Sequence, residues 1–150
     1  MTVQCIRNIG NFPALVLPFD CSQEISENNF VSSSEWYTID SNCSGYCISL
    51  DKKYKVYGIL IYDNMSRFLI QDDNNIPNFY PSQLFSLTDP SLFDPYWEYN
   101  CILIEKKECI VIGYSDLVRD YCHLRDLIDN KPDAIKQFLH HKEKLNSIGW

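Results

Sequence analysis

Two apolar runs joined by a short polar segment constrain the fold of this chain more than any other part of its sequence. The first run, residues 54–62, reads YKVYGILIY and is rich in β-branched and aromatic residues. The second run, residues 67–71, reads RFLIQ. The residues between them, 63–66, are Asp-Asn-Met-Ser, and Asp, Asn and Ser are typical of turns. The pattern predicts an antiparallel β-hairpin over residues 54–71.

Short segments on both sides of this hairpin extend the predicted β-structure. An apolar run bounded by prolines, residues 12–19, predicts an edge strand, because each proline removes a donor from the ladder. Residues 46–50 alternate as a strand does, and residues 78–89 predict a strand, a single helical turn and a further strand. Two apolar runs, 100–105 and 108–112, flank a pair of lysines and predict a second hairpin.

The last third of the chain changes to a helical pattern. Apolar residues recur at spacings of four, three and four: Leu117, Tyr121, Leu124 and Ile128. Ser115 is placed to cap this helix, and Pro132 suits the first turn of a second helix. Because strands and helices are segregated, we expect an α+β fold in a single domain, residues 1–150. Its β-rich body of antiparallel hairpins covers about 10–113 and its helical pair about 115–146. The central part of this body also resembles an SH3-like small barrel.

The net charge of −7 is unevenly distributed along the 150 residues. Residues 1–100 carry 12 acidic and 5 basic residues, whereas residues 101–150 carry 8 of each. Nucleic acids and anionic membrane surfaces are disfavoured as partners, because binding them requires basic side chains. A cationic partner is favoured, because opposite charge speeds its capture.

The cysteines and the apolar segments indicate the compartment. Seven cysteines are an odd number, and they are irregularly spaced. The N-terminal residues lack a basic segment followed by an apolar one, and no apolar run approaches the ~18 residues of a membrane span. We therefore expect a cytoplasmic protein with reduced thiols.

Residues 68–98 combine acidic and aromatic side chains and contain no lysine or arginine. The stretch holds five carboxylates and seven aromatic rings, and prolines interrupt it. A surface that presents rings together with negative charge suits a basic protein partner. The candidate contact residues are Asp72, Asp73, Asp89, Asp94, Tyr96, Trp97 and Glu98.

The sequence carries no pattern that predicts a catalytic, metal or cofactor site. Cys43 and Cys47 are separated by three residues, and no second pair of matching spacing completes a zinc site. Cys122 and His123 are neighbours on a predicted helix, so their side chains point about 100° apart and cannot pair with each other. We therefore expect a protein that is not an enzyme and has no cofactor.

Two segments of the chain resemble a known family. Residues 54–92 read YKVYGILIYDNMSRFLIQDDNNIPNFYPSQLFSLTDPSL, and residues 113–128 read GYSDLVRDYCHLRDLI. Over about residues 45–130 the chain is similar to immunity proteins of contact-dependent growth inhibition and related bacterial polymorphic toxin systems. The resemblance implies a protein that neutralises a cognate secreted toxin C-terminal domain. That toxin would be a basic nuclease, blocked at its active site or substrate-binding surface.

Two other functions remain open from the residues alone. One is an SH3-like adaptor that binds a peptide through Tyr80, Tyr96 and Trp97. The other is an enzyme that uses cysteine or aspartate chemistry.

Overall fold

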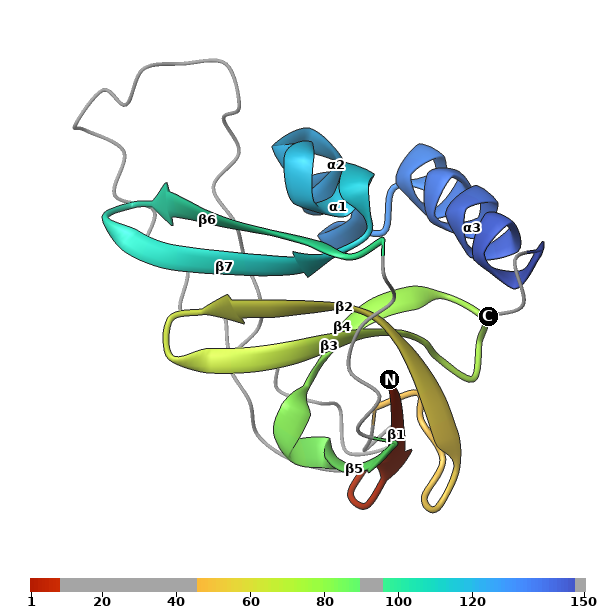
Figure 1. The fold of residues 1–150 in the computed structure, drawn as a ribbon. Helices are drawn as coiled ribbons and strands as arrows, with labels where there is room; N and C mark the ends of the chain where they lie inside the picture. The colour runs from red at the N-terminus through yellow and green to blue at the C-terminus, as the bar shows by residue number, and fades with distance from the viewer. Residues whose placement is uncertain (9–45, 90–95, 148–150) are drawn as a thin grey trace.

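The computed structural model describes residues 1–8, 46–89 and 96–147. They fold into an α+β structure, as the sequence predicts, with a seven-stranded antiparallel sheet followed by helices (Figure 1). The edge strand expected at 12–19 lies outside these residues. The strands are β1 (Thr2–Cys5), β2 (Lys53–Tyr62), β3 (Met65–Gln71), β4 (Pro77–Pro81), β5 (Phe85–Asp89), β6 (Glu98–Ile104) and β7 (Lys107–Gly113). The helices are the 3-10 turn η1 (Ser82–Leu84), α1 (Ser115–Arg119), α2 (Tyr121–Ile128) and α3 (Pro132–Ser147).

The predicted central hairpin is confirmed as β2 and β3. Its register ends with Tyr62 opposite Met65. The turn consists of two residues, Asp63 and Asn64, whose φ angles are 52° and 60°. Positive φ at both turn residues gives a twist that matches the flanking strands, and Asp and Asn tolerate this conformation better than most residues. The turn is therefore shorter than the four residues expected.

The second predicted hairpin is confirmed as β6 and β7, with a shift of one residue at its turn. The turn residues are Glu105 and Lys106, with φ angles of 49° and 66°. Seven consecutive pairs join the two strands without a register shift. Strand β7 ends at Gly113, where the β region was expected to close.

Strand β2 belongs to two parts of the sheet. Its first residues, Lys53–Lys55, pair with β1, while residues 58–62 pair with β7. A register shift relative to β3 between Val56 and Gly58 separates the two halves. The expected sequence of strand, single turn and strand after β3 is confirmed as β4, η1 and β5. Strand β5 returns to pair with β1, a strand that the sequence did not predict.

The described strands form an open sheet, so the small barrel is not confirmed. Within this part of the chain, β4, β5 and β6 each pair with one neighbour only. The prediction of a strand at residues 46–50 is wrong. The Tyr46 N–H donates to the Asn8 carbonyl, and the Ile48 N–H donates to the Tyr46 carbonyl two residues before it. Residues 46–50 therefore form a folded connection and not a strand.

The C-terminal helical region is confirmed, but its first predicted helix is divided. The Asp120 side chain accepts hydrogen bonds from the backbone N–H groups of Cys122 and His123 at 2.9 and 3.1 Å, and so caps α2. Ser115 does not cap α1; that position belongs to Tyr114, which makes no side-chain capping bond. Pro132 begins α3 as expected. The fold therefore has a short helix and two longer ones where a helical pair was predicted.

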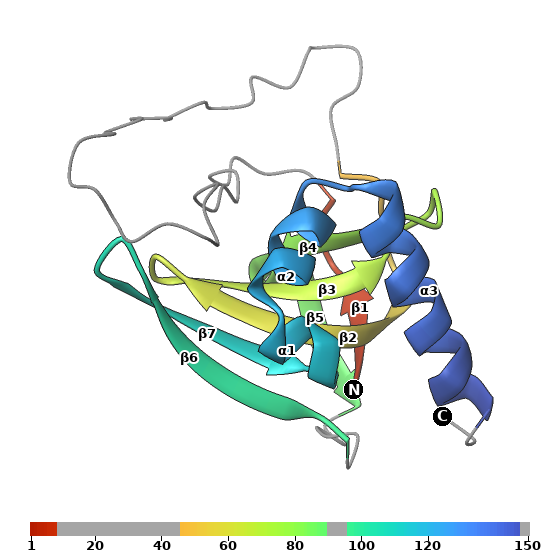
Figure 2. The ribbon, with the colours of Figure 1, turned by 90° about the horizontal axis from the view of Figure 1, so that it is seen from above.

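Two hydrophobic clusters fill the interior. The larger one lies between the sheet and the helices, where Leu117, Leu127 and Phe138 meet Leu60 and Leu69 (Figure 2). The second lies where β1 and β5 pack across the first half of β2 and the ends of β3 and β4. Its fully buried members are Val3, Cys5, Val56, Ile70 and Leu84. Because β2 contributes to both clusters, it connects the two parts of the β-structure.

Candidate protein-interaction surface

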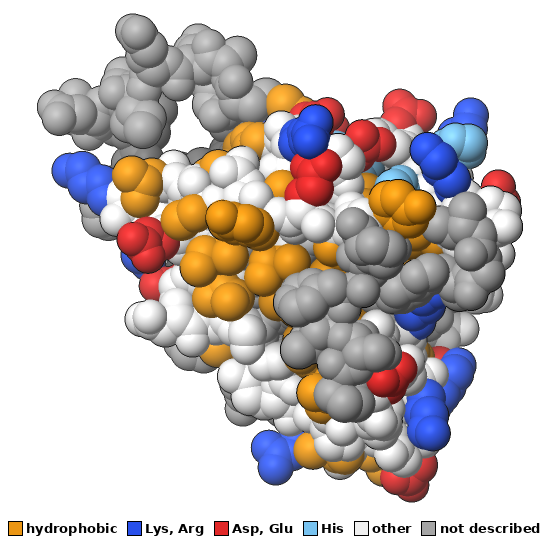
Figure 3. All heavy atoms as spheres, in the orientation of Figure 1, with side chains coloured by type: hydrophobic (Ala, Val, Ile, Leu, Met, Phe, Trp, Pro, Cys, Tyr) orange, Lys and Arg blue, Asp and Glu red, His pale blue; other side chains and the backbone are white. Residues whose placement is uncertain are grey.

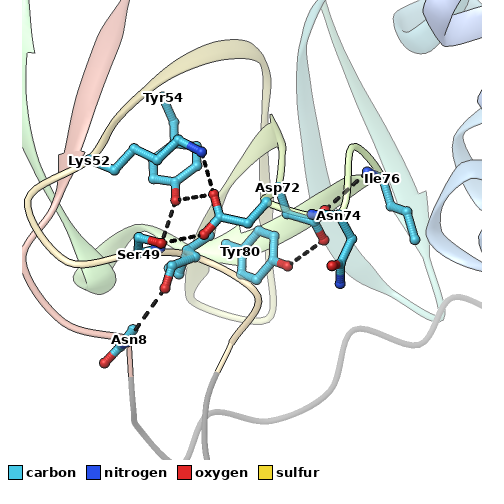
Figure 4. Close-up of polar contacts among 10 residues, drawn as sticks. Asn8, Ser49, Lys52, Tyr54, Asp72, Asn74, Ile76 and Tyr80 are labelled. Carbon is cyan, nitrogen blue, oxygen red and sulfur yellow. Dashed lines mark hydrogen bonds and ion pairs between the residues drawn. The ribbon is translucent and has the colours of Figure 1, made fainter.

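Asp72, one of the predicted contact residues, is buried in the turn between β3 and β4. Only 5% of it is exposed. Its carboxylate accepts hydrogen bonds from the backbone N–H groups of Asn74 and Ile76, from Asn78 Nδ2 at 3.2 Å and from the Tyr80 hydroxyl at 2.9 Å (Figure 4). Burial raises the pKa of Tyr80, and the Asp72 carboxylate adds to the increase. Asp72 therefore holds the turn together, and its role as a partner contact stays a prediction.

Asp73 lies beside Asp72 but belongs to a different network. Its carboxylate accepts hydrogen bonds from Ser49 Oγ at 2.6 Å, Lys52 Nζ at 2.5 Å and the Tyr54 hydroxyl at 2.9 Å. Desolvation acts to raise the pKa of Asp73, but the bonds from Lys52, Ser49 and Tyr54 outweigh it and hold the pKa below its ordinary value. Burial, with Asp73 contributing, raises the pKa of Tyr54 to about 12. Asp73 thus fastens residues 46–52 to the β3–β4 turn.

The predicted residues around the start of β6 divide between surface and structure. Tyr96 is 64% exposed, whereas Trp97 packs against the second hydrophobic cluster. The Glu98 carboxylate receives two bonds from the Arg119 guanidinium, at 2.6 and 2.8 Å, and so ties β6 to α1. Asp89 is exposed at the end of β5. Asp94 lies outside the described residues.

In the described part of the chain, the predicted residues therefore do not form one continuous exposed acidic surface. Residues 1–8, 46–89 and 96–147 carry 14 acidic and 13 basic residues, so their charge is nearly balanced. The remaining six acidic residues, with no basic ones, fall in 9–45 and 90–95. Charge therefore does not mark one part of the described surface as a binding site.

A row of exposed apolar side chains on β6 marks the candidate binding surface. Tyr99 is 80% exposed and Leu103 is 73% exposed, and the exposed Cys101 lies between them in sequence. Alternate residues of a strand share a face, so these three side chains point the same way. Their neighbours Asn100, Ile102 and Ile104 point to the opposite face, toward the helices: the Asn100 amide donates to the Val118 carbonyl of α1, and Ile102 and Ile104 pack in the larger cluster.

The row continues across two more strands. Tyr99 is paired with Ile112 and Cys101 with Ile110 on β7, which in turn are paired with Ile59 and Ile61 on β2. Residues in direct register lie on the same face of a sheet, so these side chains form one apolar surface. The four isoleucines are half-buried. We call the seven residues the apolar face: Ile59, Ile61, Tyr99, Cys101, Leu103, Ile110 and Ile112. Hydrophobic side chains gather over β6, β7 and β2 in Figure 3.

Sequence reasoning identified the strands of the apolar face but not the surface itself. In the run YNCILI of residues 99–104, apolar residues occupy both alternating positions, so the pattern does not say which side faces the helices. The only available signal was the polar Asn100 among them, whose partner, the Val118 carbonyl, is visible only in the folded chain.

Among the groups that could suggest enzymatic chemistry, His123 is held in a structural contact. His123 is buried, and its Nε2 lies 2.8 Å from the Tyr114 hydroxyl. Within residues 1–8, 46–89 and 96–147, no three His, Cys, Asp or Glu side chains are grouped to hold a metal ion. Cys47 is exposed, and Cys43 lies outside these residues.

A shallow depression of about 180 Å³ lies between β2 and the β3–β4 turn. Its lining residues are Lys52, Lys53, Tyr54, Lys55, Tyr57, Gln71, Asp72 and Asn75. Lys52 is engaged by Asp73, and Gln71 accepts a hydrogen bond from Lys142 of α3. These contacts are structural, so the apolar face remains the better candidate for function.

Comparisons with protein families, with curated proteins and with solved structures give no match for this chain. In the part of the chain that the structure describes, no helix has both the length and the apolar character needed to cross a membrane.

Proposed function

We propose that this chain is a protein-binding protein of the immunity type, which neutralises a cognate cationic toxin domain by docking its apolar face against it. The observation that supports this proposal is the exposure of Tyr99 and Leu103 on a regular strand. Apolar surfaces that extend over several strands, when left open to water, are typical of interaction sites. Tyrosine is also enriched at binding hot spots, because its ring packs and its hydroxyl remains hydrated or paired.

Charge and apolar contact have separate roles in this proposal. The net charge of −7 acts over distances of about a Debye length, roughly 8 Å at physiological salt, and draws in a partner of opposite charge. The apolar face then provides the contact, since burying one leucine side chain completely contributes about 1.5–3 kcal/mol. Raising the salt concentration should therefore slow association more than it speeds dissociation.

The experiment uses the secreted protein that this proposal expects in the neighbouring open reading frame. Its C-terminal domain is co-expressed with the chain, growth is followed, and binding is measured by calorimetry on the purified pair. We expect protection of growth and one-to-one binding. Tyr99→Ala and Leu103→Ala should each weaken binding about tenfold or more, which corresponds to about 1.4 kcal/mol or more.

The matched control is Leu87→Ala. Leu87 is 52% exposed on β5, outside the apolar face. Leu87→Ala therefore removes the same side-chain atoms as Leu103→Ala, but from a different strand. The control should bind as the unmodified chain does. Absence of both protection and binding, or equal losses for Leu87→Ala and Leu103→Ala, would contradict the proposal.

The aromatic groove of a peptide-binding adaptor has less support. Tyr80 is buried with its hydroxyl bonded to Asp72, and Trp97 packs against the second cluster. Of the three aromatic residues expected to line that groove, only Tyr96 is mostly exposed. We therefore do not propose this function.

A further inference from the structure

The outer edge of β6 differs from the other two edges of the described sheet. Strand β4 begins with Pro77 and ends with Pro81, and proline removes a donor from an edge. Strand β5 meets β1 with a register shift and ends in Asp89. Such prolines, irregularities and charges protect an edge from pairing with another chain. Strand β6 has none of them between Tyr99 and Ile104 and keeps a regular register along β7.

The position of β6 leaves this edge accessible. Figure 2 shows β6 along the outer side of the molecule, with α1 and α2 lying inward over neighbouring strands. Among the described residues, β6 pairs with β7 alone. The high exposure of Tyr99 and Leu103 shows that the face beside the edge is also open. A further strand can therefore be added to the sheet at this place.

The sequence of β6 is complementary to itself in the antiparallel direction. If two copies pair about a twofold axis at Cys101, Tyr99 of each copy lies opposite Leu103 of the other, and the two Cys101 residues face each other. Pairs of an aromatic and an aliphatic side chain are favourable across antiparallel strands. The twofold axis is perpendicular to the sheet, so the exposed side chains of both copies remain on the same face.

The charges along β6 allow a second copy to approach despite the net charge of −7. No charged residue lies between Tyr99 and Ile104. At one end, Glu98 is paired with Arg119. At the other end, the turn carries equal numbers of acidic and basic residues, Glu105, Lys106, Lys107 and Glu108. A strand that is uncharged between its ends and complementary to itself suits an identical copy.

We propose that two copies of this chain associate by pairing their β6 strands antiparallel about a twofold axis at Cys101. The pairing joins the two sheets into one and places the two apolar faces side by side. This dimer goes beyond the partner binding proposed above and does not depend on it, because it forms between isolated chains. Failure of the dimer and failure of toxin binding are therefore separate results.

The test replaces Cys101, whose exposed side chain can be changed without disturbing the interior. Purified chains are examined by analytical ultracentrifugation under reducing conditions. The unmodified chain should be dimeric. Cys101→Lys and Cys101→Asp should each raise the dimer dissociation constant about tenfold or more, because like charges then face each other across the axis. An equimolar mixture of the two variants should regain the dimer, because opposite charges then meet.

Two further measurements complete the test. Leu87→Lys places the same charge on β5 and should leave the dimer intact. Mild oxidation of the unmodified chain should give an intermolecular disulfide that peptide mapping places at Cys101 in both copies, since facing residues of antiparallel strands are close enough for such a bond. A monomeric unmodified chain, a mixture of the lysine and aspartate variants that stays monomeric, or an intermolecular disulfide confined to other cysteines would overturn the proposal.

Discussion

At the scale of single residues, the carboxylate of Asp72 lies in the β3–β4 turn among four hydrogen-bond donors, and these donors determine what a substitution there does. Two of them are backbone N–H groups, of Asn74 and Ile76, and one is the buried hydroxyl of Tyr80. A buried donor that loses its acceptor retains the full cost of its desolvation. The acidic character that made Asp72 a candidate contact in the sequence thus serves the fold.

Asp72→Ala should lower the free energy of unfolding by about 2–4 kcal/mol, because four donors, among them the buried Tyr80 hydroxyl, lose their acceptor together. Asp72→Asn retains one side-chain oxygen and should lose less, about 1 kcal/mol. Urea unfolding at neutral pH measures both. The control is Glu108→Ala at an exposed carboxylate, which should change stability by less than about 0.5 kcal/mol. A loss at Asp72 no larger than at Glu108 would show that the turn does not need the carboxylate.

His123 gives the chain a pH dependence with a definite sign. Burial lowers its pKa below the ordinary value of 6.5, although the carboxylates of Asp116, Asp120 and Asp126 act in the opposite direction. The folded chain then binds fewer protons at this site than the unfolded chain. The stability that depends on neutral His123 is fully present above pH 6.5 and is lost as the pH falls from 6.5 toward the lower folded pKa.

The measurement is the unfolding free energy of the unmodified chain and of His123→Gln between pH 7.5 and 5. The unmodified chain should lose more stability than the variant as the pH falls through this window. A nuclear magnetic resonance titration should place the pKa of His123 below 6.5. Parallel stability profiles for the two chains would contradict the assignment.

At the scale of secondary-structure elements, the hairpins could be predicted and the connections between distant segments could not. The runs that form β2 with β3 and β6 with β7 are adjacent in sequence and carry their own turn residues, so local pattern was sufficient. Strand β1 has four residues and finds its partners in β2 and β5, about 50 and 85 residues away. Nothing within so short a segment specifies such partners.

The division of the first helix shows why an apolar stripe does not locate helix ends. The spacing of Leu117, Tyr121 and Leu124 is continuous with a single helix, yet the chain leaves the helical conformation at Asp120. At that residue φ is −109° and ψ is 99°, an extended geometry from which the side chain can reach back to two N–H groups. The sequence contains the capping residue Asp120, but the apolar stripe taken alone predicts one continuous helix.

Asp120→Ala should therefore destabilise the protein by about 1 kcal/mol, within the range of about 0.5–2 kcal/mol for the loss of a helix N-cap. Asp120→Ser should preserve most of the stability, because serine also accepts a bond at this position. Ser115→Ala is the matched control, since the expected cap at Ser115 is not formed. Thermal unfolding of the three variants provides the comparison, and an equal loss for Ser115→Ala and Asp120→Ala would argue against the observed cap.

The candidate surface was only partly predictable for a similar reason. Tyr96, which is outside the apolar face, was identified from the acidic and aromatic stretch and is exposed. Tyr99 and Leu103 were placed in or beside a predicted strand, but their exposure depends on which side of that strand the helices cover. That choice is made by packing between segments far apart in the chain. The local sequence of β6 is apolar on both faces, so it does not determine which face the helices cover.

At the scale of the whole molecule, the contact between the helices and the sheet depends on two glycines. Gly58 on β2 lies opposite Gly113 on β7, and Leu117 of α1 packs over both. A Cβ atom at Gly58 would come within 2.5 Å of Leu117 Cδ2 and 3.2 Å of the Ile112 carbonyl oxygen. The absence of side chains at this pair lets α1 approach the strands that carry the apolar face on their other side.

A double-mutant cycle tests this contact. Gly58→Ala should lower the unfolding free energy by about 1–3 kcal/mol, because Leu117 must move to accommodate the new methyl group. Leu117→Ala should lower it by about 2–5 kcal/mol through the cavity it leaves. In the double variant the methyl group enters that cavity, so the combined loss of unfolding free energy should fall short of the sum of the two single losses by about 1 kcal/mol or more.

The control pairs Gly58→Ala with Leu84→Ala in the second cluster. The two losses of unfolding free energy should add within about 0.5 kcal/mol, because distant sites act independently. Simple additivity for Gly58 with Leu117 would mean that α1 does not rest on this glycine pair.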